Sequence, residues 1–241
     1  MIRLEQVAKV YTLGGVDVRA VDGVSLAIGR GEFVALVGPS GCGKTTLLNL
    51  IGGLDRPTSG EVWLDGERLD RLSDDRLTRL RRSRVGIIYQ FFNLLPTLTA
   101  WENVALPLLL DGLRGGEIEG RVWRRLEQVG LTHRARHWPH ELSGGEQQRV
   151  AIARAIVAEP RVVLADEPTG NLDSVAGGAV LELLQELNRE HRQTIILATH
   201  SLEAAHRTGE VINLRDGKIE RIEKACPELS RRACPELGRR G

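Results

Sequence analysis

Residues 33–46 of this 241-residue chain, "FVALVGPSGCGKTT", are the most informative segment for its fold. Its first part, "FVALVG", is apolar at successive positions, which is typical of a parallel strand buried on both faces. A glycine-rich loop follows, and the apolar run "LLNLIGGL" (residues 47–54) then predicts a helix. In such a strand–loop–helix unit, backbone N–H groups wrap phosphate oxygens, the lysine reaches the β- and γ-phosphates, and the next hydroxyl binds Mg²⁺. The stretch therefore predicts a nucleotide site.

Within this predicted phosphate loop, Lys44 is assigned to the phosphates and Thr45 to Mg²⁺. The alternative is a glycine turn with an incidental Lys-Thr pair, and it leaves the flanking strand and helix unexplained. The candidate nucleotide-binding residues of the loop are Gly38, Pro39, Ser40, Gly41, Cys42, Gly43, Lys44, Thr45 and Thr46.

Composition is that of a soluble globular protein, because 41% of the residues are apolar and 27% are charged. A formal net charge of +1 gives no overall attraction to nucleic acid or acidic lipid. The N-terminus lacks the apolar core of a signal peptide, and the longest apolar run, residues 104–110, is too short to span a membrane. Three scattered cysteines do not form a disulfide framework, which predicts a reduced, cytoplasmic chain.

The order of predicted elements indicates an α/β fold. Residues 1–37 are predicted strands broken by turns, one of them at Asp22-Gly23 between "VDVRAV" and "VSLAI", and another Asp-Gly turn follows at 65–66. From 96 to 140, prolines at 96, 107 and 139 separate short predicted helices. Helices at 145–158 and 179–192 then alternate with "RVVLAD" and "TIILATH", before a last β segment, "EVINLRDGKIERI". This alternation predicts a parallel sheet covered on both faces.

Two adjacent carboxylates, Asp166 and Glu167, close the apolar strand "VVLADEP". Successive strand residues point to opposite sides, so the two carboxylates need not share one role. We assign Asp166 to the Mg²⁺ shell and Glu167 to the attacking water as general base. Taken alone, an acidic pair after a strand is more often a solvated turn. Because the chain also has a predicted phosphate loop, the functional interpretation of the acidic pair is favoured over a solvated turn.

His200 and Gln90 also follow apolar strands, "TIILATH" and "RVGIIYQ". Each of them, taken singly, is equally well explained as a hydrogen-bonded surface residue. Ligands of α/β sheets, however, bind outside the carboxyl ends of the strands. The strands ending at Gly38, Gln90, Asp166 and His200 are therefore expected to converge on one edge of the sheet.

A second glycine-bearing helix start, "LSGGEQQR" at residues 142–149, raises the question of why one chain would carry two anion sites. Ser143 and Glu146 have the S-x-x-E spacing of a capping box, so an ordinary helix start accounts fully for those two residues. A cap does not require Gly144 and Gly145, whereas close approach of a phosphate does. From the residues alone, Gly144 and Gly145 therefore favour a second phosphate site, and an ordinary helix start stays open as the alternative for Ser143.

Two further segments are less informative. Residues 71–84 hold six arginines, but two aspartates dilute them and no aromatic residues interleave them, so a solvated helix face is favoured over a nucleic-acid site. The tandem octapeptides "ACPELSRR" and "ACPELGRR" cannot bury a core, which predicts a disordered tail over residues 225–241. The alternative there, a metal or redox pair of Cys226 and Cys234, lacks further ligands.

Taken in this order, the motifs of residues 1–223 resemble the ATPase subunit of ATP-binding cassette (ABC) transporters. "LSGGEQQRVAIARA" carries most of the resemblance, and "TGNLD" (residues 169–173) is similar to the family's dimer-contacting loop. The resemblance implies a P-loop NTPase of the ABC ATPase type, with a mostly parallel core sheet, an antiparallel β subdomain and a helical subdomain inserted at about residues 91–145. The ATPase domain would cover residues 1–224.

The resemblance also implies ATP hydrolysis and explains the two phosphate sites. Two subunits of the family pack head to tail, so the phosphate loop of one and the Ser143–Gly145 segment of the other enclose the same ATP. Tyr11 stands where the family stacks an aromatic ring on adenine. The implied cofactors are ATP and Mg²⁺. The implied catalytic residues are Glu167, His200, which contacts the γ-phosphate, and Gln90, which senses Mg²⁺ and the partner; the implied metal ligands are Thr45, Gln90 and Asp166.

Longer stretches, such as "YQFFNLLPTLTAWENVALPLLL" (residues 89–110), resemble the branch that contains lipoprotein-releasing, macrolide-exporting and cell-division ATPases. The resemblance implies a separate integral membrane permease with a large extracytoplasmic domain, and an ATPase placed peripherally on the inner face of the cell membrane. Two alternatives stay open: a division-type scaffold, and a soluble ABC ATPase acting on nucleic acid or the ribosome. The second usually has two cassettes or a long coiled-coil insertion, so no nucleic acid is expected.

Overall fold

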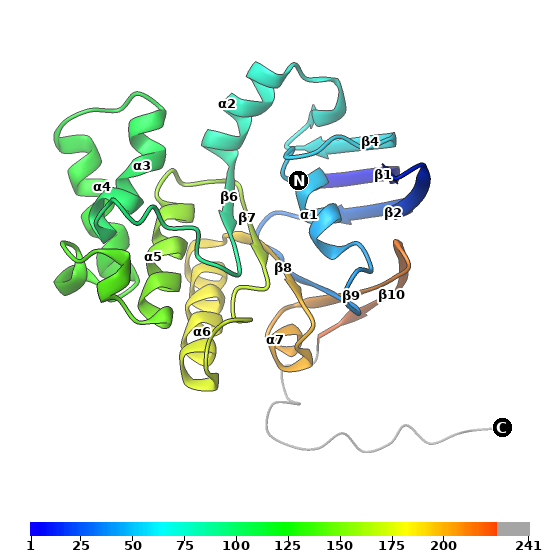
Figure 1. Cartoon of the computed structure of the whole chain (residues 1–241). Helices are drawn as coiled ribbons and strands as arrows, with labels where there is room; N and C mark the ends of the chain where they lie inside the picture. Colours follow the sequence, from blue (N-terminus) through cyan, green and yellow to red (C-terminus); the bar gives the residue numbers. More distant parts are fainter. Residues whose placement is uncertain (226–241) are drawn as a thin grey trace.

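Residues 1–225 are described by the structure, which is a computed structural model of the chain. Two β-sheets with helices around them make up the molecule (Figure 1). Of the expected tail, residues 225–241, only Ala225 is described, and its N–H donates to the Gly209 carbonyl at 3.1 Å. The rest of the expected tail, with Cys226 and Cys234, lies outside the described residues. No helix within residues 1–225 combines the length and the hydropathy needed to traverse a bilayer.

Six strands form the larger sheet, in the order β10-β9-β3-β8-β7-β6. The neighbouring pairs from β9 to β6 are all parallel, and β10 pairs antiparallel with β9. This arrangement confirms the predicted, mostly parallel core sheet. The strands are β3 (Phe33–Val37), β6 (Val85–Ile88), β7 (Val162–Asp166), β8 (Thr194–Thr199), β9 (Glu210–Arg215) and β10 (Lys218–Lys224).

The central strands β3, β7 and β8 are buried on both faces, which is why they are apolar between their ends. In β7, Val163 packs into the core beneath the helical part of the chain, whereas Leu164 packs into the core beside the second sheet. Ile195 and Ile196 of β8 divide between the same two cores. In these central strands the polar side chains stand at the strand ends, where the candidate residues lie, whereas β9 and β10 carry polar residues along their length.

The smaller sheet is antiparallel, in the order β2-β1-β4-β5, and matches the expected β subdomain. The turn predicted at Asp22-Gly23 is wrong, because β2 runs straight through both residues. They form a bulge opposite Ala8, and the Asp22 N–H donates to the Gly217 carbonyl at 2.9 Å instead of closing a hairpin. The bounds are β1 (Ile2–Leu13), β2 (Val16–Ile28), β4 (Ser59–Leu64) and β5 (Glu67–Arg68).

Helices cover the large sheet and form a lobe to one side of it, on the left in Figure 1. Pro107 lies inside α3 and does not separate two helices as expected. Helix α6 begins five residues before the expected Ala179, because the Asp173 carboxylate accepts the N–H groups of Val175 and Ala176. The helices are α1 (Lys44–Ile51), α2 (Asp74–Arg84), α3 (Ala100–Leu110), α4 (Gly116–Gln128), α5 (Gly144–Ile156), α6 (Ser174–His191) and α7 (Leu202–His206), with short 3₁₀ turns at Leu69–Arg71, Thr132–Arg134 and Pro139–Glu141.

Candidate functional site

A pocket of about 670 Å³ opens at the carboxyl ends of the parallel strands. Figure 1 shows α7 next to β8 at this part of the sheet. The sheet brings together polar residues from four strand ends that are up to 160 residues apart in the chain, as the sequence predicts. The pocket is lined by Ala20, Ser40, Gly41, Gly43, Lys44, Thr45, Thr46, Gln90, Asp166, Glu167 and His200.

The phosphate loop runs from β3 to α1, and two of its glycines are required by close backbone contacts. A Cβ on Gly38 would lie 2.2 Å from the Leu214 carbonyl oxygen, and one on Gly43 would lie 2.1 Å from that of Ala20. Gly43 also has a φ of +103°, a left-handed value that other residues rarely adopt. Helix α1 starts at Lys44, and its first residues line the pocket, so the partial positive charge of the helix N-terminus faces the pocket. No side chain caps this end, which leaves its N–H groups free for a ligand.

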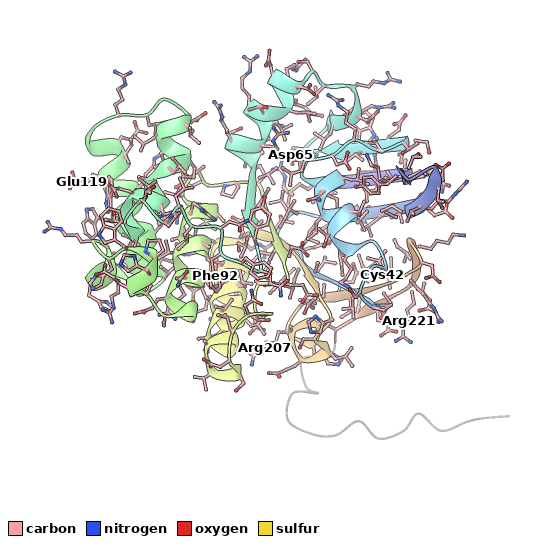
Figure 2. The ribbon with its side chains drawn as sticks, viewed as in Figure 1. Cys42, Asp65, Phe92, Glu119, Arg207 and Arg221 are labelled. Carbon is pink, nitrogen blue, oxygen red and sulfur yellow. The ribbon has the colours of Figure 1, made fainter. Side chains whose placement is uncertain are left out.

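Lys44 is held against the loop by the loop's own carbonyl groups. Its Nζ donates to the carbonyls of Gly38 at 2.7 Å and Pro39 at 3.1 Å, and the residue is only 8% exposed. Cys42, labelled in Figure 2, is buried, and its Sγ lies 4.0 Å from the same Nζ. The ammonium is thereby placed among groups that would surround a bound phosphate.

Thr45 and Asp166 meet at the floor of the pocket, where the Thr45 hydroxyl donates to the Asp166 carboxylate at 3.1 Å. Burial raises the pKa of Asp166, although the bond from Thr45 opposes that shift. Within residues 1–225, no three His, Cys, Asp or Glu side chains cluster as a metal cage would require. A hydroxyl and a carboxylate are instead hard oxygen donors, and two of them suffice for Mg²⁺ when water and phosphate oxygens fill the rest of its coordination shell.

Glu167 and His200 form the second polar pair, with His200 Nδ1 3.0 Å from the Glu167 carboxylate. The Glu167 side chain is 17% exposed and that of His200 is 71% exposed, so the carboxylate lies deeper in the pocket. Glu167 has a left-handed φ of +49°, and its N–H donates to the Ala198 carbonyl at 2.9 Å. The chain thus leaves the β conformation between Asp166, the last residue of β7, and Glu167. Such strained backbone is common at functional sites, in keeping with the two roles expected for the two carboxylates.

Gln90 lies two residues beyond β6 and is tied to the loop that follows Glu167. Its Nε2 donates to Asn171 Oδ1 at 3.1 Å, and Asn171 Nδ2 donates back to the Gln90 carbonyl at 3.1 Å. A Cβ on Gly170 would lie 2.8 Å from Gln90 Nε2. Asn171 belongs to the "TGNLD" segment, but its contact with Gln90 was not expected. No local spacing could have indicated it, because 81 residues separate the partners.

Seven assigned residues lie outside the pocket lining. Three of them, Gly38, Pro39 and Cys42, belong to the phosphate loop itself, and the other four are Tyr11, Ser143, Gly144 and Gly145. The Tyr11 hydroxyl donates to Asp55 at 2.7 Å, and Lys9 Nζ lies 4.8 Å from the centre of its ring. Burial, with the neighbouring Asp55 carboxylate, raises the pKa of Tyr11.

The capping box predicted at the start of α5 is confirmed. Ser143 Oγ accepts the Glu146 N–H at 3.3 Å, and Glu146 accepts the Ser143 N–H at 2.8 Å, which lowers the pKa of the Glu146 carboxyl. The presence of glycine at position 145 can also be explained by packing within this chain, which the sequence did not suggest. A Cβ on Gly145 would lie 3.0 Å from the Ala176 Cβ of α6, so helix packing by itself disfavours a larger residue there.

Comparisons with known proteins agree with this geometry. The family model described as "ABC transporter" matches residues 21–170. The "Lipoprotein-releasing system ATP-binding protein LolD" of Xanthomonas euvesicatoria pv. vesicatoria is 50% identical over 222 residues, which cover 92% of this chain and 91% of that protein. The ABC transporter ATP-binding protein MJ0796 of Methanocaldococcus jannaschii is 47% identical over 228 residues, or 93% of this chain and 97% of that protein.

Two solved structures of MJ0796 are also similar. One, described as a dimeric post-hydrolysis state bound to ADP and Pi, superposes with a TM-score of 0.87 at 45% identity and covers 94% of this chain and 99% of that one. The other, described as a dimeric transporter cassette, has a TM-score of 0.86 at 46% identity with the same coverage.

Proposed function

The chain belongs to the ABC transporter family, and we propose that it is the ATP-hydrolysing subunit of a complex whose membrane permease is a separate chain. The observation that carries the proposal is a single pocket that holds Lys44, the Thr45–Asp166 pair and the Glu167–His200 pair. The proposal includes one ATPase domain over residues 1–224, whose inserted helical part, at about 91–145, contains α3 and α4.

The phosphate loop and the Thr45–Asp166 pair are assigned to ATP and Mg²⁺. Residues 38–46 would wrap the phosphates, with Lys44 as the counter-charge. Thr45 and Asp166 would ligate Mg²⁺, with Gln90 at the pocket wall as a third ligand. The cation would offset negative charge on the β- and γ-phosphate oxygens.

Glu167 and His200 are assigned to the hydrolytic step. The Glu167 carboxylate lines the pocket and can take a proton from a water that attacks the γ-phosphate. Its bond to His200 uses Nδ1, so Nε2 is the ring nitrogen left to contact the γ-phosphate. The exposed fraction of His200, 71%, keeps that nitrogen within reach of a ligand.

The Ser143–Gly145 segment is assigned to the ATP of a second copy of the chain. Ser143 is exposed and does not line the pocket of its own chain, so a contact with nucleotide requires another subunit. MJ0796, which is similar over nearly the whole chain, has been solved as a dimer. A head-to-tail dimer supplies each ATP with one phosphate loop and one Ser143–Gly145 segment. Tyr11 is assigned to the adenine at the margin of the same site.

The permease is proposed to be of the lipoprotein-releasing kind, with a large extracytoplasmic domain. Support comes from the identity to LolD over 92% of this chain. The subunit would then sit on the inner face of the cell membrane. Phe91, 72% exposed directly after Gln90, is the apolar side chain best placed to contact the permease.

The experiment that tests the proposed activity measures phosphate release from Mg-ATP by the purified chain and by Glu167→Gln. We expect the variant to retain ATP binding and to lose hydrolysis by at least about 100-fold, the size of effect typical of a lost general base. Equal turnover by the two proteins would contradict the assignment of Glu167.

The partner is tested separately, by isolating the tagged chain from detergent-solubilised membranes and identifying what accompanies it. A permease with a large extracytoplasmic domain is the expected companion. Recovery of ribosomes, nucleic acid or septal proteins in its place would contradict the assignment.

A further inference from the structure

Helix α5 holds both catalytic segments through one buried glutamine. Gln148 is 0% exposed, and its Nε2 donates to the Pro168 carbonyl at 2.8 Å and to the Tyr89 carbonyl at 3.3 Å. Pro168 is the residue after Glu167, and Tyr89 is the residue before Gln90. A single side-chain amide therefore joins the backbones that carry two of the proposed catalytic residues.

The orientation of this amide is determined by its two acceptors. A glutamine NH₂ group has two hydrogens, and each finds one of the two carbonyls. Its Oε1, buried like the rest of the side chain, has no hydrogen-bond partner among the described residues. A buried acceptor left unpaired opposes stability, so the donor function is what Gln148 contributes at this place.

Both segments need an outside support, because their backbones are strained. Glu167 has a φ of +49°, and on the other side Phe92 and Asn93 have φ values of +58° and +49°. Left-handed residues other than glycine persist only where surrounding contacts enforce them. Further along the same helix, Arg154 donates to the Phe92 carbonyl at 2.8 Å and to the Asn93 carbonyl at 2.5 Å. Figure 2 labels Phe92 in this segment beside α5.

We infer that Gln148 is a positioning residue for ATP hydrolysis, which holds Gln90 and Glu167 in register by binding the Tyr89 and Pro168 carbonyls. The inference rests on the roles proposed above for those two residues. Gln148 is fully buried and outside the pocket lining, so it acts on the water and the metal only through its neighbours. Because it does not touch the phosphate loop, its loss lowers kcat and leaves the KM for ATP nearly unchanged.

Two matched substitutions test this. Gln148→Met keeps the length of the side chain and removes both donors. Gln193→Met is the control, because Gln193 Nε2 also donates to two backbone carbonyls, those of Pro160 and Thr194, at the opposite end of the strands. We expect Gln148→Met to lower kcat at least about 10-fold with KM within about twofold, since small misplacement of catalytic groups lowers rates strongly. Gln193→Met should keep the kcat of the unmodified chain.

A third variant provides a readout that a purely structural role would not affect. Gln148→Glu introduces a carboxylate that cannot donate to either carbonyl when ionised, and burial raises the pKa of such a group. Its kcat, divided by that of the unmodified chain at the same pH, should therefore rise as the pH falls and the carboxyl gains a proton.

The outcomes are separable from those of the proposed function. Hydrolysis by the unmodified chain, and its loss in Glu167→Gln, establish the activity independently. With that established, an unchanged kcat in Gln148→Met, or a loss no greater than in Gln193→Met at matched melting temperature, would overturn the inference. A flat pH profile of the Gln148→Glu ratio would overturn it as well.

Discussion

Single side chains at the pocket are already held in place by the backbone around them. Lys44 donates to the carbonyls of Gly38 and Pro39, so its ammonium lies in a ring of loop atoms. Asp166 is held by the Thr45 hydroxyl, and Glu167 by the ring of His200. Fixed groups of this kind lose little freedom on binding a ligand, which favours affinity and rate.

Lys44→Ala should weaken ATP binding, because it removes the cation nearest the proposed phosphates. A charge-assisted hydrogen bond contributes about 1.5–3 kcal/mol, so we expect a rise in the Kd for ATP of about 10- to 100-fold. Isothermal titration with Mg-ATP measures it. Lys218→Ala is the control, since Lys218 is 65% exposed and pairs with Asp22 on the β subdomain. Unchanged affinity in Lys44→Ala would contradict the loop assignment.

Asp166→Asn should stabilise the nucleotide-free chain at neutral pH. Burial raises the pKa of Asp166 above its ordinary value of 3.8, so the folded state binds the proton more tightly than the unfolded state. The free energy of unfolding therefore falls as the pH rises from 3.8 through the raised pKa, and the full cost is present above that pKa. Asparagine removes that cost and can still accept the Thr45 hydroxyl.

Thermal melts of Asp166→Asn and the unmodified chain, at pH 7 and near pH 4, measure this effect. The advantage of the variant should be largest at pH 7 and should shrink as the pH approaches 3.8. Asp111→Asn, at an exposed aspartate, controls for the loss of one carboxylate. A variant that is less stable than the unmodified chain at pH 7 would contradict the expected sign.

At the scale of elements, helix starts are determined by side chains that cap them. Thr99 and Ser143 form capping boxes with Glu102 and Glu146, and Asp173 caps α6. The last of these moved the start of α6 ahead of the position that apolar periodicity suggested. A cap acts on free N–H groups of the first turn, so it sets the boundary even where the apolar face begins later.

Gly145→Ala should destabilise the contact between α5 and α6. The added Cβ would lie 3.0 Å from the Ala176 Cβ, and overpacking of this kind costs about 1–3 kcal/mol. Chemical denaturation measures the loss. The double variant Gly145→Ala/Ala176→Gly removes the opposing methyl group and should recover most of it. If the double variant were no more stable than Gly145→Ala, the packing account would be wrong.

The same double variant separates packing from ligand binding. If Gly145→Ala also loses ATP hydrolysis, and the double variant regains stability but not hydrolysis, the result would support the proposed contact of Gly145 with ATP. Restored stability with restored hydrolysis would assign the glycine to packing alone.

At the scale of the whole molecule, the pocket and the Ser143–Gly145 segment lie on different parts of the chain. None of these three residues lines the pocket, although both sites have the chemistry of an anion-binding helix start. One chain therefore presents two half-sites, and the symmetric way to join them is a pair of chains.

Glu167→Gln should convert from monomer to dimer when Mg-ATP is added, because bound ATP bridges the two half-sites and is not consumed. Light scattering after size exclusion, with and without Mg-ATP, measures the mass. Glu167→Gln/Ser143→Arg is the control, since a long cation at the exposed helix start should prevent closure over ATP. Equal dimerisation of the control would contradict an ATP shared through Ser143.

The parallel sheet, the phosphate loop and the capping box could be predicted from the amino-acid sequence, because strand burial, loop sterics and helix caps depend on residues close together in the chain. The edge where Lys44, Asp166 and His200 meet follows from the strand ends alone. Contacts between segments far apart in the chain depend on how the elements pack, so they could be seen only in the folded chain. Asp22-Gly23 is a bulge because the Asp22 N–H meets Gly217, and Gly145 is confined by Ala176.

The hydrogen bonds of Gln148 are the clearest example of contacts that the sequence could not predict. Its two carbonyl partners lie 59 and 20 residues away, on segments that the sheet brings together. From the sequence, Gln148 is one more polar residue in a helix that starts with a capping box. Its burial, and with it the need for partners, exists only once β6, β7 and α5 are packed, because the packed chain alone removes water from the amide.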